Sequence, residues 1–183
     1  MAIKQGIEQH LNNKGYLIAD GATGTELIKS GALTKGVTPE HLILSNPDAL
    51  VQVHRSYYEA GSDYVVANNF GATRIKLEEW GLESKFEEIN IKAIQCVKKA
   101  LKLSGKKAFV ASSIGPTGRL LPPLGAATME ELIALYKEQI AIIAKEGINL
   151  FVIETMSDLR EAKAAYISHK GYLQYSRRRL FDL

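Results

Sequence analysis

Polar side chains follow each of four short apolar runs in this 183-residue chain. They are Asp20 after the first run, Asn68 and Asn69 after the second, Ser112 and Ser113 after the third, and Glu154 after the fourth. If the runs are neighbouring strands, Asp20 and Glu154 share one sheet edge, where an acidic pair suits a substrate ammonium group or acid–base catalysis. The structural alternative is that Asp20 caps the following helix and Glu154 pairs with a nearby lysine.

The loop after Asp20 is small and rich in hydroxyl groups. It consists of Gly21, Ala22, Thr23, Gly24 and Thr25. Its glycines permit a tight turn and close approach of a ligand to the backbone, and the N–H groups that begin the following helix favour an anion. The loop matches neither GxGxxG nor the GK[ST] ending of a nucleotide-binding loop. It therefore suits the carboxylate of a small substrate as well as a phosphate.

The elements that must position these residues alternate regularly along the chain. We expect strands at 16–19, 64–67, 108–111 and 150–153, and helices at 25–30, 47–60, 85–103, 129–145 and from 157 onward. Asn46, Pro47 and Gly61 are typical of the ends of the second helix. Thr128 and Glu131 have the spacing of a capping box at the start of the fourth.

Repeated strand–helix units predict an α/β fold with a parallel sheet and right-handed crossovers. The runs YLIA, YVVA, AFVA and LFVI alternate little, as expected for strands covered on both faces. An open doubly wound sheet and part of a (β/α)₈ barrel both fit. A whole barrel usually needs about 250 residues, so four units correspond to about half of one.

Composition narrows the functional class. The chain has 46% hydrophobic and 23% charged residues and a net charge of +3. Three of its positive charges lie together at 177–179, and without them the formal net charge is zero. We therefore expect no broad nucleic-acid-binding face. No apolar run is long enough to span a membrane and the N-terminus lacks a signal-peptide pattern, which predicts a cytoplasmic protein. The single cysteine, Cys96, lies beside an apolar helical stripe, and we expect it to be buried and inert.

Other segments give weaker signals. The connection at 112–125 is long and rich in glycine and proline, which is typical of a functional loop; the alternative is a plain rigid turn. The four histidines form no metal or catalytic pattern. We assign residues 1–168 to the α/β unit and 169–183 to an atypical basic tail, produced by fraying, truncation or a change of reading frame.

With these residues placed, the chain resembles the homocysteine S-methyltransferase family, which includes the homocysteine-binding module of cobalamin-dependent methionine synthase and the betaine–homocysteine methyltransferases. The resemblance rests on DGATGTEL at 20–27, NPDALVQVHRSYYEAGSDYVVANNFGAT at 46–73, EIN at 88–90, SIGPTG at 113–118 and VIET at 152–155. It extends from about residue 15 to 166.

The resemblance implies a (β/α)₈ TIM barrel, here represented by its first four units, that takes part in methionine biosynthesis. Family members bind zinc through three cysteines, and the zinc holds homocysteine as a thiolate that attacks an activated methyl group. Carried over to this sequence, Asp20 and Glu154 correspond to partners of the homocysteine ammonium group. The backbone of residues 21–25 corresponds to a carboxylate site, and Asn68 and Asn69 to rim residues.

This sequence departs from the family pattern at the metal site. The zinc cysteines of the family lie in the second half of the barrel, whereas no cysteine follows Cys96 here. We therefore expect a substrate-binding half without metal ligands, and no methyl transfer by this chain alone. Methylcobalamin, betaine, S-methylmethionine and S-adenosylmethionine all stay open as methyl donors. The alternatives are a non-catalytic half-barrel that self-associates through its open edges, or an unrelated barrel enzyme that binds phosphate at the first loop.

Overall fold

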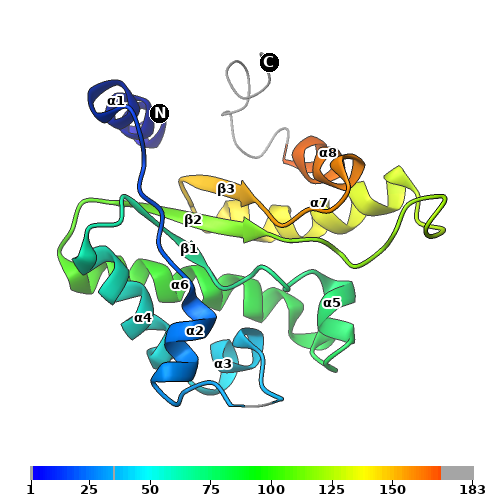
Figure 1. Cartoon of the computed structure of the whole chain (residues 1–183), viewed down its shortest axis with the longest axis horizontal. Coiled ribbons are helices and arrows are strands. Elements are labelled where there is room, and N and C mark those ends of the chain that lie inside the picture. The colour runs from blue at the N-terminus through cyan, green and yellow to red at the C-terminus, as the bar shows by residue number, and fades with distance from the viewer. Residues whose placement is uncertain (1, 35, 170–183) are drawn as a thin grey trace.

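The computed structural model describes residues 2–34 and 36–169 and has a parallel sheet at its centre (Figure 1). Within these residues the sheet has three strands, β1 (Tyr64–Ala67), β2 (Phe109–Ile114) and β3 (Leu150–Ile153), in the order β1-β2-β3. In register, Val66 pairs with Ala111, and Ala111 pairs with Leu150. The parallel α/β class expected from the sequence is confirmed.

Helices precede and follow the strands in the alternation that the sequence predicts. They are α1 (Ala2–Lys14), α2 (Thr23–Lys29), α3 (Pro39–Ser45), α4 (Pro47–Ala60), α5 (Arg74–Glu78), α6 (Phe86–Ser104), α7 (Met129–Lys145) and α8 (Leu159–Ser168), with a 3₁₀ turn η1 (Glu83–Lys85). Helices α1, α3 and α5 were not expected from the sequence. The others begin within about two residues of their predicted positions.

The end signals of the longer helices act as the sequence predicts. The Asn46 side chain accepts a hydrogen bond from the backbone of Ala49 at the start of α4, and Gly61 ends that helix with a φ of 106°. At the start of α7, Thr128 and Glu131 exchange both hydrogen bonds of a capping box. These are short-range interactions, which explains why the sequence alone specifies them.

The first predicted strand, 16–19, is wrong: this segment lies beside β1 without forming a ladder. The carbonyl of Ile18 accepts the N–H groups of Asp63 and Tyr64. In return, however, carboxylates rather than carbonyls accept the backbone hydrogens: Asp63 accepts the Ile18 N–H at 2.8 Å, and Asp20 accepts the Val66 N–H at 3.0 Å. Side-chain acceptors therefore replace the regular ladder along this edge.

The third predicted strand is longer than expected. Ser112 and Ser113 were predicted to follow a strand at 108–111, but both lie inside β2. Their side chains point to opposite faces because strand residues alternate. Ser112 therefore faces the same side as Val110, and Ser113 the same side as Ala111.

One face of the sheet, called here the outer face, carries the main core. Its strand residues include Val65, Val110 and Ile114, all buried. Helices α4 and α6 lie along this side in Figure 1, with α7 beside them. Cys96 on α6 belongs to the same core, so its predicted burial is confirmed, and burial raises the pKa of its thiol to about 11.

The opposite face, called here the inner face, is only partly covered. Tyr64, Val66, Leu150 and Val152 lie on it by register and are half-buried. Helix α1 lies at the end of this face where β2 begins. There the His10 ring packs edge-on against Phe109, with ring centroids 5.9 Å apart. Figure 1 places α1 and α6 on opposite sides of the sheet.

Two further predictions, on the tail at 169–183 and on membrane-spanning segments, can be compared with the structure only within the described residues. The atypical tail at 169–183 lies outside them except for His169. Across residues 2–34 and 36–169, no helix has the length and apolar character needed to cross a membrane.

Candidate functional site

Asp20 and Glu154 lie at the edge of the sheet where the strands end. Asp20 ends the extended segment beside β1, and Glu154 directly follows β3. Glu154 is held to β2 by a backbone hydrogen bond from its N–H to the Ile114 carbonyl, 3.2 Å long. The two carboxylates are close enough for the charge of Glu154 to act on Asp20. The prediction that they share a rim is thus supported by the structure.

The Asp20 carboxyl has a higher pKa than an ordinary aspartate, so it loses its proton less readily. Burial raises the pKa of its carboxyl to about 6, against the lowering effect of backbone hydrogen bonds from Val66 and from Asp20 itself, and the nearby Glu154 raises it further. Ala22, not Asp20, is the N-cap residue of α2, and it makes no side-chain capping bond. The helix-capping role considered for Asp20 is therefore wrong.

Glu154 is positioned by β2 and by the backbone that follows it. The Ser113 hydroxyl donates to Glu154 Oε1 at 2.5 Å. Among residues 2–34 and 36–169 no lysine pairs with it, so the described structure gives the lysine-pairing alternative no support. Thr155, the next residue, has a left-handed φ of 61°. This conformation is costly for a β-branched residue, and sequence reasoning gave no signal for it.

The two asparagines after β1 have different surroundings. Asn69 is fully buried. Its side chain exchanges hydrogen bonds with the Ser112 hydroxyl and accepts the Ser113 N–H, while its carbonyl accepts from Gln139. Asn69 therefore joins β1, β2 and α7 below the rim. Asn68 is half-buried and remains the rim candidate.

The loop after Asp20 is shorter than the sequence suggests, because Thr23 already begins α2. Residues 21–25 thus form one extended turn and the first helical turn. Gly21 lies against Tyr57 of α4: a Cβ added at Gly21 would stand 2.9 Å from the Tyr57 hydroxyl oxygen. Burial and the nearby Glu26 and Asp20 raise the pKa of Tyr57. Sequence reasoning missed Tyr57 because the contact joins distant segments.

The long connection after β2 is fixed by a buried carboxylate. Glu161 of α8 accepts hydrogen bonds from the Thr117 N–H at 2.8 Å, the Thr117 hydroxyl at 2.7 Å and the Tyr136 hydroxyl at 3.0 Å. The loop after β1 also meets this connection, since a Cβ on Gly115 would lie 2.6 Å from the ring of Phe70 and 2.8 Å from its carbonyl oxygen. The connection is therefore rigid where it leaves the strand.

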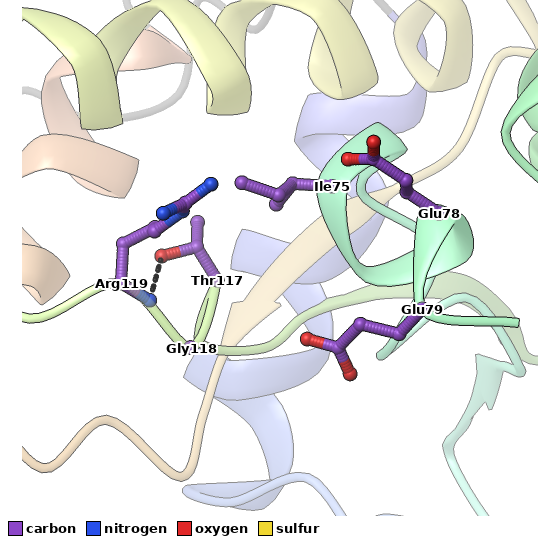
Figure 2. Close-up of a pocket in the computed structure, with 6 residues that line it drawn as sticks. All are labelled: Ile75, Glu78, Glu79, Thr117, Gly118 and Arg119. Atoms are coloured by element: carbon purple, nitrogen blue, oxygen red, sulfur yellow. Dashed lines mark hydrogen bonds between the residues drawn. The ribbon is translucent and has the colours of Figure 1, made fainter.

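A separate pocket of about 290 Å³ lies beside this connection (Figure 2). It is lined by Ile75, Glu78 and Glu79 of the α5 region and by Thr117, Gly118 and Arg119 after β2. The Arg119 N–H donates to the Thr117 hydroxyl, and Glu79 pairs with Lys76. None of its lining residues is one of the predicted site residues, so the pocket is distinct from the acidic rim.

The residues present do not fit the three-cysteine zinc site that the resemblance implies. The chain has one cysteine, and Cys96 is buried in the outer core on α6, where its thiol contacts the Pro47 carbonyl. Across residues 2–34 and 36–169, no group of three histidine, cysteine, aspartate or glutamate side chains could hold a metal ion. No chemical step is therefore assigned to zinc in this chain.

These features define a parallel α/β protein with two acids, Asp20 and Glu154, at the edge of the sheet where the strands end, the usual location of small-molecule sites in this class. The sequence profile described as "Homocysteine S-methyltransferase" matches residues 17–176. Because this match covers most of the chain, the chain belongs to the homocysteine S-methyltransferase family.

Solved structures agree with this assignment at the level of the fold. The oxidised form of the homocysteine methyltransferase MmuM from Escherichia coli is similar, with a TM-score of 0.79 and 22% sequence identity over 91% of this chain. Its metallated form gives a TM-score of 0.78 at 21% identity, also over 91% of this chain. The chain spans 62% of the length of either MmuM structure.

Proposed function

We propose that this chain binds L-homocysteine at the strand ends, with Asp20 and Glu154 as the partners of the ammonium group. The observation that carries the proposal is a pair of carboxylates at one sheet edge whose hydrogen bonds come from neutral donors. Asp20 accepts from the backbone of Val66, and Glu154 accepts from the hydroxyl of Ser113. A bound ammonium group would supply the positive charge that this pair lacks.

The carboxylate of the same ligand would lie at residues 21–25. Ala22 provides no side-chain acceptor for the first N–H groups of α2, so these donors can serve an anionic ligand. The hydroxyls of Thr23 and Thr25 are further donors, and the Asn68 amide is a candidate from the neighbouring strand. Binding both charged ends would fix the direction of the thiol side chain.

The reaction that this site would serve is methyl transfer to the homocysteine sulfur, which yields methionine. We interpret the chain as part of a (β/α)₈ barrel of the family. A free thiol has a pKa of about 8.5 and is mostly protonated at neutral pH, and the residues here do not fit the zinc site that would ionise it. The proposal for this chain alone is therefore binding and orientation of homocysteine, without turnover.

Isothermal titration calorimetry of the full chain with L-homocysteine tests this proposal. We expect binding by the wild type and at least tenfold weaker binding by Asp20→Asn and by Glu154→Gln, because each removes one charge facing the ammonium group. Asp48→Asn is the matched control, since Asp48 is an exposed acid that pairs with Lys99. It should bind as the wild type does.

A ligand without the amine sharpens the test. 4-Mercaptobutanoate keeps the thiol and the carboxylate of homocysteine, and it should bind much more weakly than homocysteine to the wild type. Equal affinity for both ligands, or unchanged affinity in both acid variants, would contradict the proposed site. Stoichiometric zinc binding together with methionine formation by the purified chain would contradict the absence of turnover.

A second candidate role, self-association, is supported by the open side of β3. In the part of the chain that the structure describes, β3 pairs only with β2, and all four of its residues are half-buried. Unpaired strand edges favour association with another strand. Analytical ultracentrifugation over a hundredfold concentration range should then detect a dimer, and a monomer throughout would exclude this role.

A further inference from the structure

His54 lies on α4 and is fully buried. Neither ring nitrogen has a hydrogen bond of normal geometry in the structure described for residues 2–34 and 36–169. Burial lowers the pKa of His54 to about 4, although the side chain of Asn68 lies close enough to raise it. The ring is therefore neutral at physiological pH and carries one N–H donor and one acceptor nitrogen.

Asn68 has a matching deficit. It follows β1 directly, and its Oδ1 atom is buried without a hydrogen-bond partner among the described residues. An unpaired buried donor or acceptor costs about 1–3 kcal/mol. The two side chains lie close enough to interact, so a donor on His54 and the acceptor on Asn68 can satisfy each other.

We propose that His54 is a positioning residue for the homocysteine site: its ring N–H donates to Oδ1 of Asn68 and directs the Asn68 amide nitrogen toward the ligand carboxylate. This inference rests on the proposed function, because Asn68 contacts the ligand only if the strand-end site is used. Without the His54 donor, the Asn68 amide can turn over and present its oxygen, which repels a carboxylate. His54 itself does not touch the ligand.

Three substitutions at His54 separate positioning from simple packing. His54→Leu fills much of the space but removes the donor, and it should weaken L-homocysteine binding roughly tenfold. His54→Asn and His54→Gln place an amide N–H near the position of one or the other ring nitrogen. One of them should restore affinity to within about threefold of the wild type. Asp48→Asn on the same helix is the control and should leave affinity unchanged.

The binding data can also overturn the proposal. Wild-type affinity in His54→Leu, or equal weakening in all three variants, would mean that the ring acts only through packing. In an Asn68→Ala background, His54→Leu should cause no further loss, because its effect passes through Asn68. A full additional loss in that background would likewise contradict the proposal.

A nitrogen NMR spectrum of the ring keeps the hydrogen bond testable even if the chain binds no homocysteine. The His54 N–H signal, assigned by its loss in His54→Gln, should persist from pH 5 to 8 and shift in Asn68→Ala. It should not shift in Asp48→Asn. An unchanged His54 signal in Asn68→Ala would refute the hydrogen bond. Failure of the wild type to bind homocysteine, with this shift present, would refute the proposed function alone.

Discussion

The outer and inner faces of the sheet have similar sequences but different surroundings. On the outer face, Val65 and Ile114 are completely buried beneath α4, α6 and α7. On the inner face, Val66 and Val152 are half-buried, and α1 covers only the end where β2 begins. Apolar strand residues on both faces are typical of a sheet covered on both sides. The outer face thus accounts for most of the core. Asp20 and Glu154 lie beside the inner face, which the helices cover incompletely.

The largest expected difference between the faces is in unfolding free energy. Ile94→Ala, in the outer core, should lower it by about 2–5 kcal/mol, because it leaves a cavity in fully packed surroundings. Val152→Ala on the inner face should cost about 1 kcal/mol or less, because this side chain is already partly in water. Urea unfolding of both variants measures the contrast. Equal losses would mean that the inner face is packed as well as the outer one.

A polar comparison gives the next largest effect. Glu161→Ala leaves Thr117 and Tyr136 without their shared buried acceptor and should cost about 2–3 kcal/mol. Glu138→Ala is the control, because Glu138 pairs with Arg74 in an exposed position and should cost less than about 1 kcal/mol. Denaturant midpoints with unchanged slopes would measure both values. Similar costs would remove the argument that Glu161 fixes the connection after β2.

The pH dependence of stability tests the acid at the rim. The folded-state pKa of Asp20 is raised from 3.8 to about 6, so the folded state holds this proton more tightly than the unfolded state. Its contribution to stability is full below pH 4 and is lost as the pH rises through about 6, a change on the order of 1 kcal/mol after allowance for partial exposure. Asp20→Asn should remove this component.

Asp63 provides the opposite sign for that experiment. Burial acts to raise the pKa of Asp63, but hydrogen bonds from Lys14 and Ile18 lower it overall. Its contribution is therefore present above its unfolded pKa and is lost as the pH falls through the folded value. Difference curves of Asp20→Asn and Asp63→Asn against the wild type should slope in opposite directions. Parallel slopes would contradict the assigned environments.

The smallest expected effect is at Ser113. Ser113→Ala removes the hydroxyl that donates to Glu154 and should lower stability by about 1 kcal/mol or less. Because Glu154 can then rotate, homocysteine affinity should fall a few-fold. Thermal unfolding and calorimetric titration of the same preparation measure both quantities. A large stability loss without any affinity change would mean that Ser113 supports the sheet rather than the rim.

The parts of the fold that the sequence predicted depend on short-range chemistry. The capping box of Thr128 and Glu131 and the left-handed Gly61 each need only neighbours within one helical turn. The segment at 16–19 could not be predicted correctly, because carboxylates from two distant positions, Asp20 and Asp63, take the place of ladder carbonyls. Its apolar residues are typical of a strand, and only the tertiary structure shows that these carboxylates compete with carbonyl groups for the backbone N–H donors.

The candidate site follows the same division. Asp20 and Glu154 were predicted because each directly follows an apolar run. Tyr57, Glu161 and His54 were missed as site components because their relevant contacts join helices to loops far away in sequence. Asn69 looked equivalent to Asn68 in the sequence, yet a single step along the bent chain places it in the buried network with Ser112.

The close approach of Gly115 to Phe70 limits how this region can be engineered. Shortening Phe70 would remove the ring clash but not the contact with its main-chain oxygen, so no replacement at position 70 makes room for a side chain at 115. In a library randomised at position 70 and over residues 113–119, and selected for a new ligand, every surviving clone should keep glycine at 115. Phe70, which is 39% exposed, should vary freely. Diversity for altered specificity is therefore best placed at position 70.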